Sequence, residues 1–305
     1  MIKLGYKLMS EEHGPTDLVR NANRAEQAGF DFAAISDHFF PWVEEQGHSP
    51  FAWSVLGAVA NATRHIGLMT AVTCPIMRYH PAIIAQGTAT LGLLSDKRFT
   101  LGLGAGERLN EHVVGEGWPG RGERHERLAE AVDIIQGLLA GTLTNYRGTY
   151  FVLDDARLFD RPHVKPPIVI AAGGPRAARI AARKGDGVIA TEPRADLVEA
   201  FISTGGSGPR YAEVAMCYGT QEEEAQQTAH RLFPLVNYRL AGYGGTARHR
   251  QLRVSHQTCV SRNGSPKGEL RAISGPPSAG DRSLHPGRLR SHHPRSNRPK
   301  PGRVS

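Results

Sequence analysis

The sequence predicts a parallel α/β protein of the TIM-barrel type, and three observations support this fold class. Residues 1–232 alternate short apolar runs with longer amphipathic segments, the pattern of strands and helices in turn. Strict alternation of this kind predicts a parallel sheet covered by helices. The chain has 305 residues, a length that α/β barrels reach without a domain boundary. Seven strands can be placed, one short of the eight that close such a barrel.

The apolar runs predict strands at Lys3–Met9, Phe30–Ser36, His65–Thr73, Arg98–Ala105, Ile168–Ala172, Gly187–Thr191 and Glu213–Tyr218. The amphipathic segments predict helices at Pro15–Gly29, Pro50–Thr63, Pro81–Ser95, Arg124–Ala140, Pro175–Gly185, Ala195–Phe201 and Gln221–Leu232. Start and stop signals support these bounds: Thr16, Asp17, Ser49 and His80 suit helix starts, and Gly29, Gly141 and Gly185 suit helix ends. The segment Asn145–His163 breaks the alternation and predicts a hairpin insertion.

The charge of the chain is divided unevenly. The net charge is +8, but residues 243–305 carry 13 Lys and Arg against two acids, whereas residues 1–242 carry 24 against 27. The body is therefore mildly acidic. The basic segment is rich in proline and has no Phe or Trp, so residues 233–305 are predicted to form a disordered tail. Aromatic side chains do not interleave with its charges, which argues against a nucleic-acid-binding arm.

The cellular setting follows from what the sequence lacks. The three cysteines, Cys74, Cys217 and Cys259, have no metal-binding spacing, so no metal is expected. Neither a signal peptide nor an apolar run of membrane-spanning length can be recognised. We therefore expect a cytoplasmic protein without a membrane partner.

Titratable side chains follow two of the predicted strands. Asp37, His38 and Trp42 come after one apolar run, and Glu107 and Asn110 come after another. The carboxyl ends of parallel strands meet at one face of a barrel, so both clusters are expected to border a single pocket. This layout is that of an enzyme.

The roles of these side chains leave alternatives open on chemistry alone. His38 could act as a base near neutral pH, or it could be a capped loop histidine. Glu107 could be desolvated beside a ligand, or it could be a helix-start glutamate that faces solvent. Trp42 could equally fill the core.

Two glycine-containing segments indicate a bound cofactor. Gly102–Gly106 lacks the context of a dinucleotide fingerprint and is better interpreted as space for a ring. Ala171–Pro175 ends one strand and opens a helix, a geometry that offers backbone N–H groups and a helix dipole to a phosphate. A plain tight turn is the alternative at this second segment.

Five strings resemble a known family: SDHFFPW (36–42), QGHSPFAW (46–53), MRYHPAIIAQ (77–86), RFTLGLGAGERLNE (98–111) and IVIAAGGPRAARIAARKGDG (168–187). They are similar to the luciferase-like oxidoreductases that use the 8-hydroxy-5-deazaflavin coenzyme F-420, and most of all to the glucose-6-phosphate dehydrogenase-like branch. FMN is the less favoured cofactor. The resemblance ends at about Leu232.

The resemblance implies specific roles. His38 takes the hydroxyl proton as hydride leaves for the deazaflavin, Glu107 acts as general acid toward the reduced ring, and Trp42 lies against the reacting centre. The implied cofactor contacts are Asp37, Thr70, Ala71, Val72, Thr73, Ala105, Gly106, Asn110, Ala172, Gly173 and Gly174. The family often has a non-proline cis peptide within Thr70–Thr73. Thr191 and Arg194 are the implied substrate contacts, the substrate being an alcohol and possibly a sugar phosphate, and a homodimer is implied.

The tail is interpreted as the product of a reading-frame error near Arg231–Pro234. Back-translation of Pro234–Arg253 and Leu284–Ser305, shifted by one nucleotide, can give two segments in family order, the second with the apolar strand HIILDQI. The barrel is then predicted to lack its eighth strand and last helix. The alternatives for this chain are an inactive product of a disrupted gene and an FMN-dependent luciferase-like monooxygenase.

Overall fold

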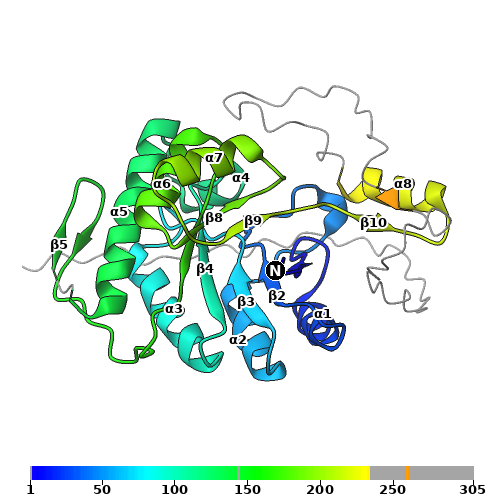
Figure 1. Ribbon diagram of the computed structural model, residues 1–305, viewed down its shortest axis with the longest axis horizontal. Helices are drawn as coiled ribbons and strands as arrows, with labels where there is room; N and C mark the ends of the chain where they lie inside the picture. The colour runs from blue at the N-terminus through cyan, green and yellow to red at the C-terminus, as the bar shows by residue number, and fades with distance from the viewer. Residues whose placement is uncertain (1, 143–144, 234–258, 261–305) are drawn as a thin grey trace, which may run out of the picture. The chain divides into compact units, whose positions relative to one another are not determined.

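A curved parallel sheet of seven strands forms the centre of the fold (Figure 1). The computed structural model describes residues 2–142, 145–233 and 259–260. The strands are paired in the order β1 (Gly5–Leu8), β2 (Phe32–Ile35), β3 (Gly67–Thr70), β4 (Phe99–Leu103), β7 (Ile168–Ala171), β8 (Gly187–Ala190) and β9 (Arg210–Ala212). All six pairings are parallel, and spatial order follows chain order. This confirms the predicted TIM-barrel fold class.

Helices return the chain between successive strands. They are α1 (Pro15–Gln27), α2 (Ala52–Ala62), α3 (Pro81–Leu94), the short α4 (Arg108–Glu111), α5 (Arg121–Ala140), α6 (Pro175–Lys184), α7 (Ala195–Ser203) and α8 (Glu222–Leu232), with 3-10 turns η1 (Glu44–Gln46) and η2 (His112–Val114). Prolines occupy the first turns of α1, α3 and α6, where a missing N–H has no cost. His80 caps α3 by accepting from the Ala82 N–H at 3.2 Å.

The predicted start of the first helix at Pro15 is confirmed, whereas the second helix begins after the predicted Pro50. The residue before α1 is Gly14, so neither Thr16 nor Asp17 is its cap. The second helix begins at Ala52, because the Ser49 hydroxyl is used elsewhere and donates to the His38 carbonyl at 2.9 Å. That bond ties the loop after β2 to the approach to α2.

The seventh strand lies earlier than predicted. β9 covers Arg210–Ala212 and not Glu213–Tyr218, although the Glu213 N–H still donates to the Ala190 carbonyl at 3.0 Å. Beyond it, Val214 and Met216 are exposed, so the apolar run that suggested a strand is not buried in the sheet. β10 (Cys217–Tyr218) pairs instead with β11 (Cys259–Val260) in a separate two-stranded sheet.

Apolar side chains form two cores, one on each face of the sheet. Ala34, Met69, Ala71, Val169 and Ile189 cluster inside the curve of the sheet. The alternate strand positions pack outward against the helices, and this larger core includes fully buried Leu8, Ile35, Leu101 and Ile170. The near-continuous apolar runs in the sequence follow from this burial on both faces.

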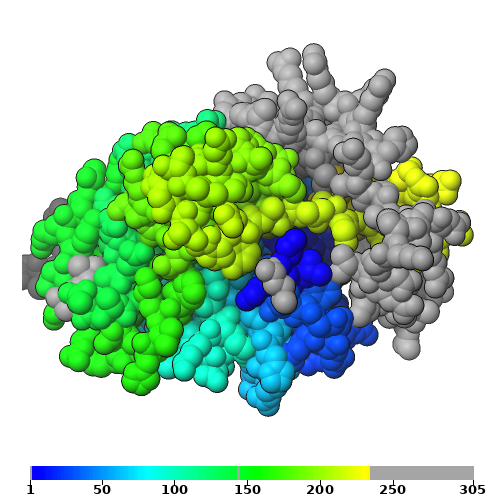
Figure 2. All heavy atoms as spheres, in the orientation of Figure 1, coloured from blue at the N-terminus to red at the C-terminus, as the bar shows by residue number. Residues whose placement is uncertain are grey.

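The two outer strands of the sheet are β1 and β9. Within the described residues, no strand pairs with the outer edge of either. Lys7 of β1 connects them, since its ammonium lies 2.7 Å from the Glu213 carboxylate and donates to the Ala71 carbonyl at 2.8 Å. Figure 2 shows the dark-blue N-terminal residues at the surface beside the yellow-green segment that contains β9.

The hairpin segment contains the antiparallel strands β5 (Tyr146–Arg147) and β6 (Val152–Leu153). The Glu130 carboxylate of α5 accepts from the Phe151 N–H at 2.8 Å and so fixes the hairpin to that helix. The predicted tail, residues 233–305, and its interpretation as a frame error lie outside the described residues, apart from Phe233 and Cys259–Val260.

Candidate active site

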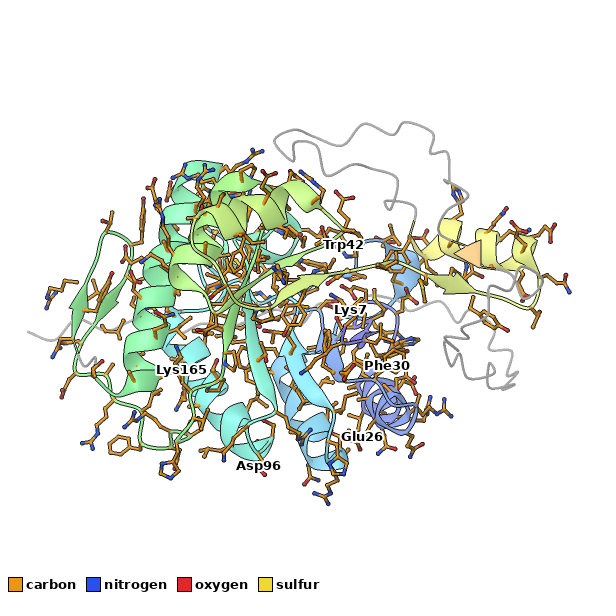
Figure 3. The ribbon with its side chains drawn as sticks, in the orientation of Figure 1. Lys7, Glu26, Phe30, Trp42, Asp96 and Lys165 are labelled. Atoms are coloured by element: carbon orange, nitrogen blue, oxygen red, sulfur yellow. The ribbon has the colours of Figure 1, made fainter. Side chains whose placement is uncertain are left out.

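The candidate catalytic side chains lie where the carboxyl ends of the strands meet. His38 follows β2 and Glu107 follows β4. Figure 3 shows Trp42 at the opposite end of the strands from Glu26, Asp96 and Lys165. The His38 and Trp42 rings meet edge to face, with centroids 4.9 Å apart. The structure therefore brings His38 and Trp42 together, as the sequence predicted.

A buried glutamate holds His38, and sequence reasoning missed it. Glu11 Oε1 lies 2.8 Å from His38 Nδ1, and the Glu11 side chain is 1% exposed. The imidazole and the carboxylate are thus in direct polar contact. Glu11 Oε2 accepts from the Ser36 hydroxyl at 3.1 Å. The carboxylate is therefore fixed on one side and meets the imidazole on the other.

The ionisation of Glu11 suits this role. Burial alone would raise the pKa of Glu11, but the hydrogen bond and charge of His38 outweigh burial and lower the pKa overall. An ionised carboxylate beside Nδ1 favours the tautomer with its proton on Nδ1, which leaves Nε2 as the basic nitrogen. Glu11 follows β1 as His38 follows β2, so its position after an apolar run was the signal that could have revealed it.

Glu107 lies close enough to His38 and Glu11 for their charges to act on it. Desolvation by neighbouring protein atoms raises the pKa of Glu107, while the charge of His38 opposes this effect. The side chain is nevertheless exposed to solvent. A ligand that displaced this water would strengthen the burial effect further. Glu107 is thus suited to hold a proton that it can donate.

The cradle beside Glu107 is formed by the ends of β3 and β4. The Ala71–Val72 peptide bond is cis, within the segment where the resemblance placed one. The Thr70 hydroxyl donates to the Gly102 carbonyl at 2.9 Å, and Thr73 N–H donates to the same carbonyl at 2.9 Å. Both threonines thus bind the neighbouring strand, so a ring could contact the cradle only through other atoms.

The glycines in and after β4 have a packing role that the sequence did not reveal. A Cβ on Gly102 would lie 1.9 Å from the Thr70 carbonyl oxygen, and one on Gly104 would lie 2.6 Å from Val72 Cγ2. Gly106 has a φ of 69°, and a Cβ there would lie 2.3 Å from Cys74 Sγ. The glycines therefore allow β3 and the residues after it to approach β4. Space for a ring against their main chain stays a prediction.

The Asp37 carboxylate joins several segments beneath the site through hydrogen bonds. Its side chain is fully buried and accepts hydrogen bonds from Thr73 Oγ1 at 2.7 Å, Tyr79 Oη at 3.0 Å, Trp53 Nε1 at 3.1 Å and Arg78 Nη2 at 3.1 Å. A buried carboxylate with four donors needs no further partner. A cofactor contact by Asp37 stays a prediction, and this carboxylate would have to release a donor to make it.

Asn110 positions the loop that carries His38. Its side-chain oxygen accepts from the Phe39 N–H at 2.8 Å and the Phe40 N–H at 3.1 Å. The Asn110 side chain is buried. Its oxygen is therefore engaged within the protein, and only its amide nitrogen could serve the predicted cofactor contact.

The turn before α6 has the features of a phosphate site. A Cβ on Gly173 or Gly174 would meet nothing within 4 Å, so both main chains border open space. Gly174 precedes α6 without a side-chain cap, which leaves the first N–H groups of the helix for a ligand. The Ala172 N–H is already bonded to the Ile189 carbonyl at 2.8 Å. The donors therefore come from the residues after Ala172.

The predicted substrate contacts occupy an acidic corner. Arg194 donates to both oxygens of Asp196, at 2.7 and 2.6 Å, and its third nitrogen lies 3.5 Å from Glu192. Thr191 is exposed beside this group. Two carboxylates thus more than balance the single guanidinium, and a phosphate would have to displace Asp196 to reach it.

Comparison with known proteins identifies the family of this chain. The family model for luciferase-like monooxygenases matches residues 2–258, which extends past Leu232, where the resemblance was expected to end. The chain belongs to this family. Within the described residues, no group of three or more metal-ligating side chains is present, and no helix has both the length and the hydrophobicity to cross a membrane.

Relatives within the luciferase-like family carry F-420 in their names. The chain is 41% identical over 249 residues to a coenzyme F-420-dependent glucose-6-phosphate dehydrogenase of Amycolatopsis mediterranei, covering 77% of this chain and 75% of the relative. It is 47% identical over 187 residues to a coenzyme F-420-dependent hydroxymycolic acid dehydrogenase of Mycobacterium tuberculosis, with 61% of this chain covered. The match spans about half of that protein, 52% of its length.

A solved structure that is similar to this chain carries the same cofactor in its name as the two relatives. A coenzyme F-420-dependent secondary alcohol dehydrogenase, bound to an F-420–acetone adduct, superposes with a TM-score of 0.72 at 31% identity. The superposition covers 76% of each chain. The sequence resemblance to F-420-dependent oxidoreductases of the luciferase-like family is thereby confirmed.

Proposed function

We propose that this luciferase-like protein is a coenzyme F-420-dependent dehydrogenase that moves a hydride between an alcohol carbon and the deazaflavin. The observation that carries the proposal is the Glu11–His38 pair beside Trp42, with Glu107 in the same site. A base held by a buried carboxylate and a separate proton-bearing carboxyl group meet the needs of alcohol oxidation. The names of the relatives support the same cofactor and reaction.

The residues of this chain fit the group. The open turn at Gly173–Gly174 would hold its phosphate, and the cradle at Ala71–Val72 with Ala105 and Gly106 would hold its ring. When bound, F-420 supplies a hydride acceptor. His38 Nε2 would take the hydroxyl proton of the substrate, and the Glu11 carboxylate would stabilise the imidazolium that results. Glu107 would hold the proton needed on the side of the ring, and Trp42 would exclude water.

The substrate is proposed as an alcohol in contact with Thr191 and Arg194. Because Asp196 and Glu192 already neutralise Arg194, the proposal extends to alcohols that carry no phosphate. Oxidation of glucose 6-phosphate and of isopropanol, followed by the loss of F-420 absorbance, would distinguish the two kinds of substrate. We further propose a cytoplasmic homodimer, which light scattering on the purified protein would test.

The cofactor assignment is tested by titration. We expect quenching of F-420 fluorescence to give a lower dissociation constant for F-420 than for FMN. Tighter binding of FMN would instead favour the flavin-dependent monooxygenase alternative. Binding of neither by the 305-residue chain, with binding by the product of a frame-restored gene, would favour the disrupted-gene alternative.

A further inference from the structure

Three guanidinium groups and an imidazole gather where the first turns of α5 and α6 meet. Arg121, Arg124 and His125 belong to α5, and Arg176 belongs to α6. Arg176 crosses between the helices, since its Nη1 lies 3.6 Å from the position of a Cβ on Gly122. Burial lowers the pKa of His125, and the positive charges of Arg176, Arg124 and Arg121 lower it further. We call these four side chains the guanidinium cluster.

The positive charges of the guanidinium cluster lie at the N-termini of α5 and α6, where the helix dipoles repel them. The N-terminus of a helix carries partial positive charge, so cations there are unfavourable and anions favourable. No acidic residue lies in the first turn of α6. The acid in the first turn of α5, Glu123, pairs with Arg127 at 2.8 Å. Neither helix has a side-chain cap, because Gly120 and Gly174 precede them. The start of α6 therefore lacks a compensating anion, and the anion at the start of α5 is shared with Arg127.

The polar atoms of the cluster are incompletely satisfied. Arg124 Nε and His125 Nδ1 are buried and have no hydrogen-bond partner among the described residues. Arg124 itself is held in place, because Nη1 donates to the Gly106 carbonyl at 3.1 Å and the guanidinium lies 4.5 Å above the Trp118 ring. Such buried, unsatisfied nitrogens are uncommon and call for a partner.

Among the described residues, Glu126 forms an ion pair with the cluster, and the charge of Glu107 also acts on Arg124. Glu126 lies 3.2 Å from Arg176 Nη2, which leaves Nη1 on the side of Gly122. The charges of Arg121 and Arg124 take part in no ion pair within the part of the chain that the structure describes. The cluster thus keeps excess positive charge next to Gly106 and to the turn at Gly173–Gly174.

We propose that the guanidinium cluster is a carboxylate-binding subsite for the acidic side chain of the deazaflavin coenzyme, beyond the phosphate held at Gly173–Gly174. This inference rests on the proposed function. Coenzyme F-420 carries carboxylates beyond its phosphodiester, and planar guanidinium groups bind carboxylates by two parallel hydrogen bonds. The location fits, because Arg124 binds the cradle and Arg176 follows the phosphate turn.

The test compares three ligands on the full 305-residue chain by fluorescence titration: neutral 8-hydroxy-5-deazariboflavin, its 5′-phosphate, and complete F-420. We expect Arg121→Gln and Arg176→Gln each to raise the dissociation constant of F-420 by about tenfold, the effect of losing one charge-assisted contact. The dissociation constants of the other two ligands should stay unchanged. Arg183→Gln, an exposed arginine in the last turn of α6, is the matched control.

Each other outcome is decisive. If the variants bind F-420 as the parent does, the carboxylate subsite is refuted while the proposed function stands. If they weaken the 5′-phosphate as much as F-420, the cluster binds phosphate and the proposal is wrong. If the parent binds none of the three ligands, the proposed function fails first. Arg176→Lys keeps the charge, so restored F-420 affinity in that variant would exclude a folding defect in Arg176→Gln.

Discussion

Replacement of Glu11 by glutamine keeps the shape of the side chain and removes its charge. In the parent, Glu11 Oε1 lies 2.8 Å from His38 Nδ1 in a site where Glu11 is 1% exposed. A hydrogen bond to a charged group contributes about 1.5–3 kcal/mol. Since about 1.4 kcal/mol corresponds to a factor of ten, turnover of Glu11→Gln should fall by about 10- to 150-fold. The glutamine amide can also donate to Nδ1, which would favour the wrong tautomer of His38.

The assay separates catalysis from binding and folding. Turnover is followed by the change in F-420 absorbance, and we expect kcat to fall while KM and the F-420 dissociation constant change little. Glu45→Gln, the same substitution at an exposed position of η1, is the control and should behave as the parent. Parental turnover in a folded Glu11→Gln protein would show that the Glu11–His38 contact does not orient the base.

Further predictions concern the neighbouring groups. His38→Ala should lower turnover by about a hundredfold or more, the scale for a positioned acid or base. Glu107→Gln should do the same without changing F-420 affinity, and parental turnover in either variant would remove that residue from the mechanism. Burial and the charge of Glu11 raise the pKa of Glu12 from 4.5 to about 7, so the folded state holds this proton more tightly than the unfolded chain. The unfolding free energy of the parent should therefore fall as pH rises between these values, and Glu12→Gln should melt above the parent at pH 8 and with it at pH 4. Resequencing the gene across codons 225–240 should reveal a one-nucleotide error, and an unchanged reading would refute the frameshift.

The strand and helix pattern was accessible from sequence because buried parallel strands are apolar on both faces. Six of the seven strands overlap their predicted ranges in this way, from β1 to β8. The seventh was misplaced because Val214 and Met216 lie in an apolar run yet remain exposed. An apolar pattern in the sequence indicates which residues could share one face of a strand, but it does not indicate whether another element covers that face.

The site was predictable only in part for a related reason. His38 and Glu107 could be placed together because strand ends converge, whatever the side-chain packing. Glu11 was missed because its role depends on a 2.8 Å contact with His38, a residue 27 positions away. Asp37 was assigned to the cofactor, whereas its four donors come from residues whose approach depends on the packing of α2 and the chain after β3. Contacts between distant segments carry no local signature in sequence.

The close approach of β3 to β4 constrains how such a protein can diverge. A Cβ at Gly102 would collide with the Thr70 carbonyl, a backbone atom of β3, so a substitution there requires one of the two strands to move. A Cβ at Gly104 would collide with the Val72 side chain. New substrate preferences would then have to arise in the loops after the strands, such as the one with Thr191 and Arg194. The residues around Gly102 are thus expected to change slowly in evolution, whereas the loop with Thr191 and Arg194 is expected to change faster.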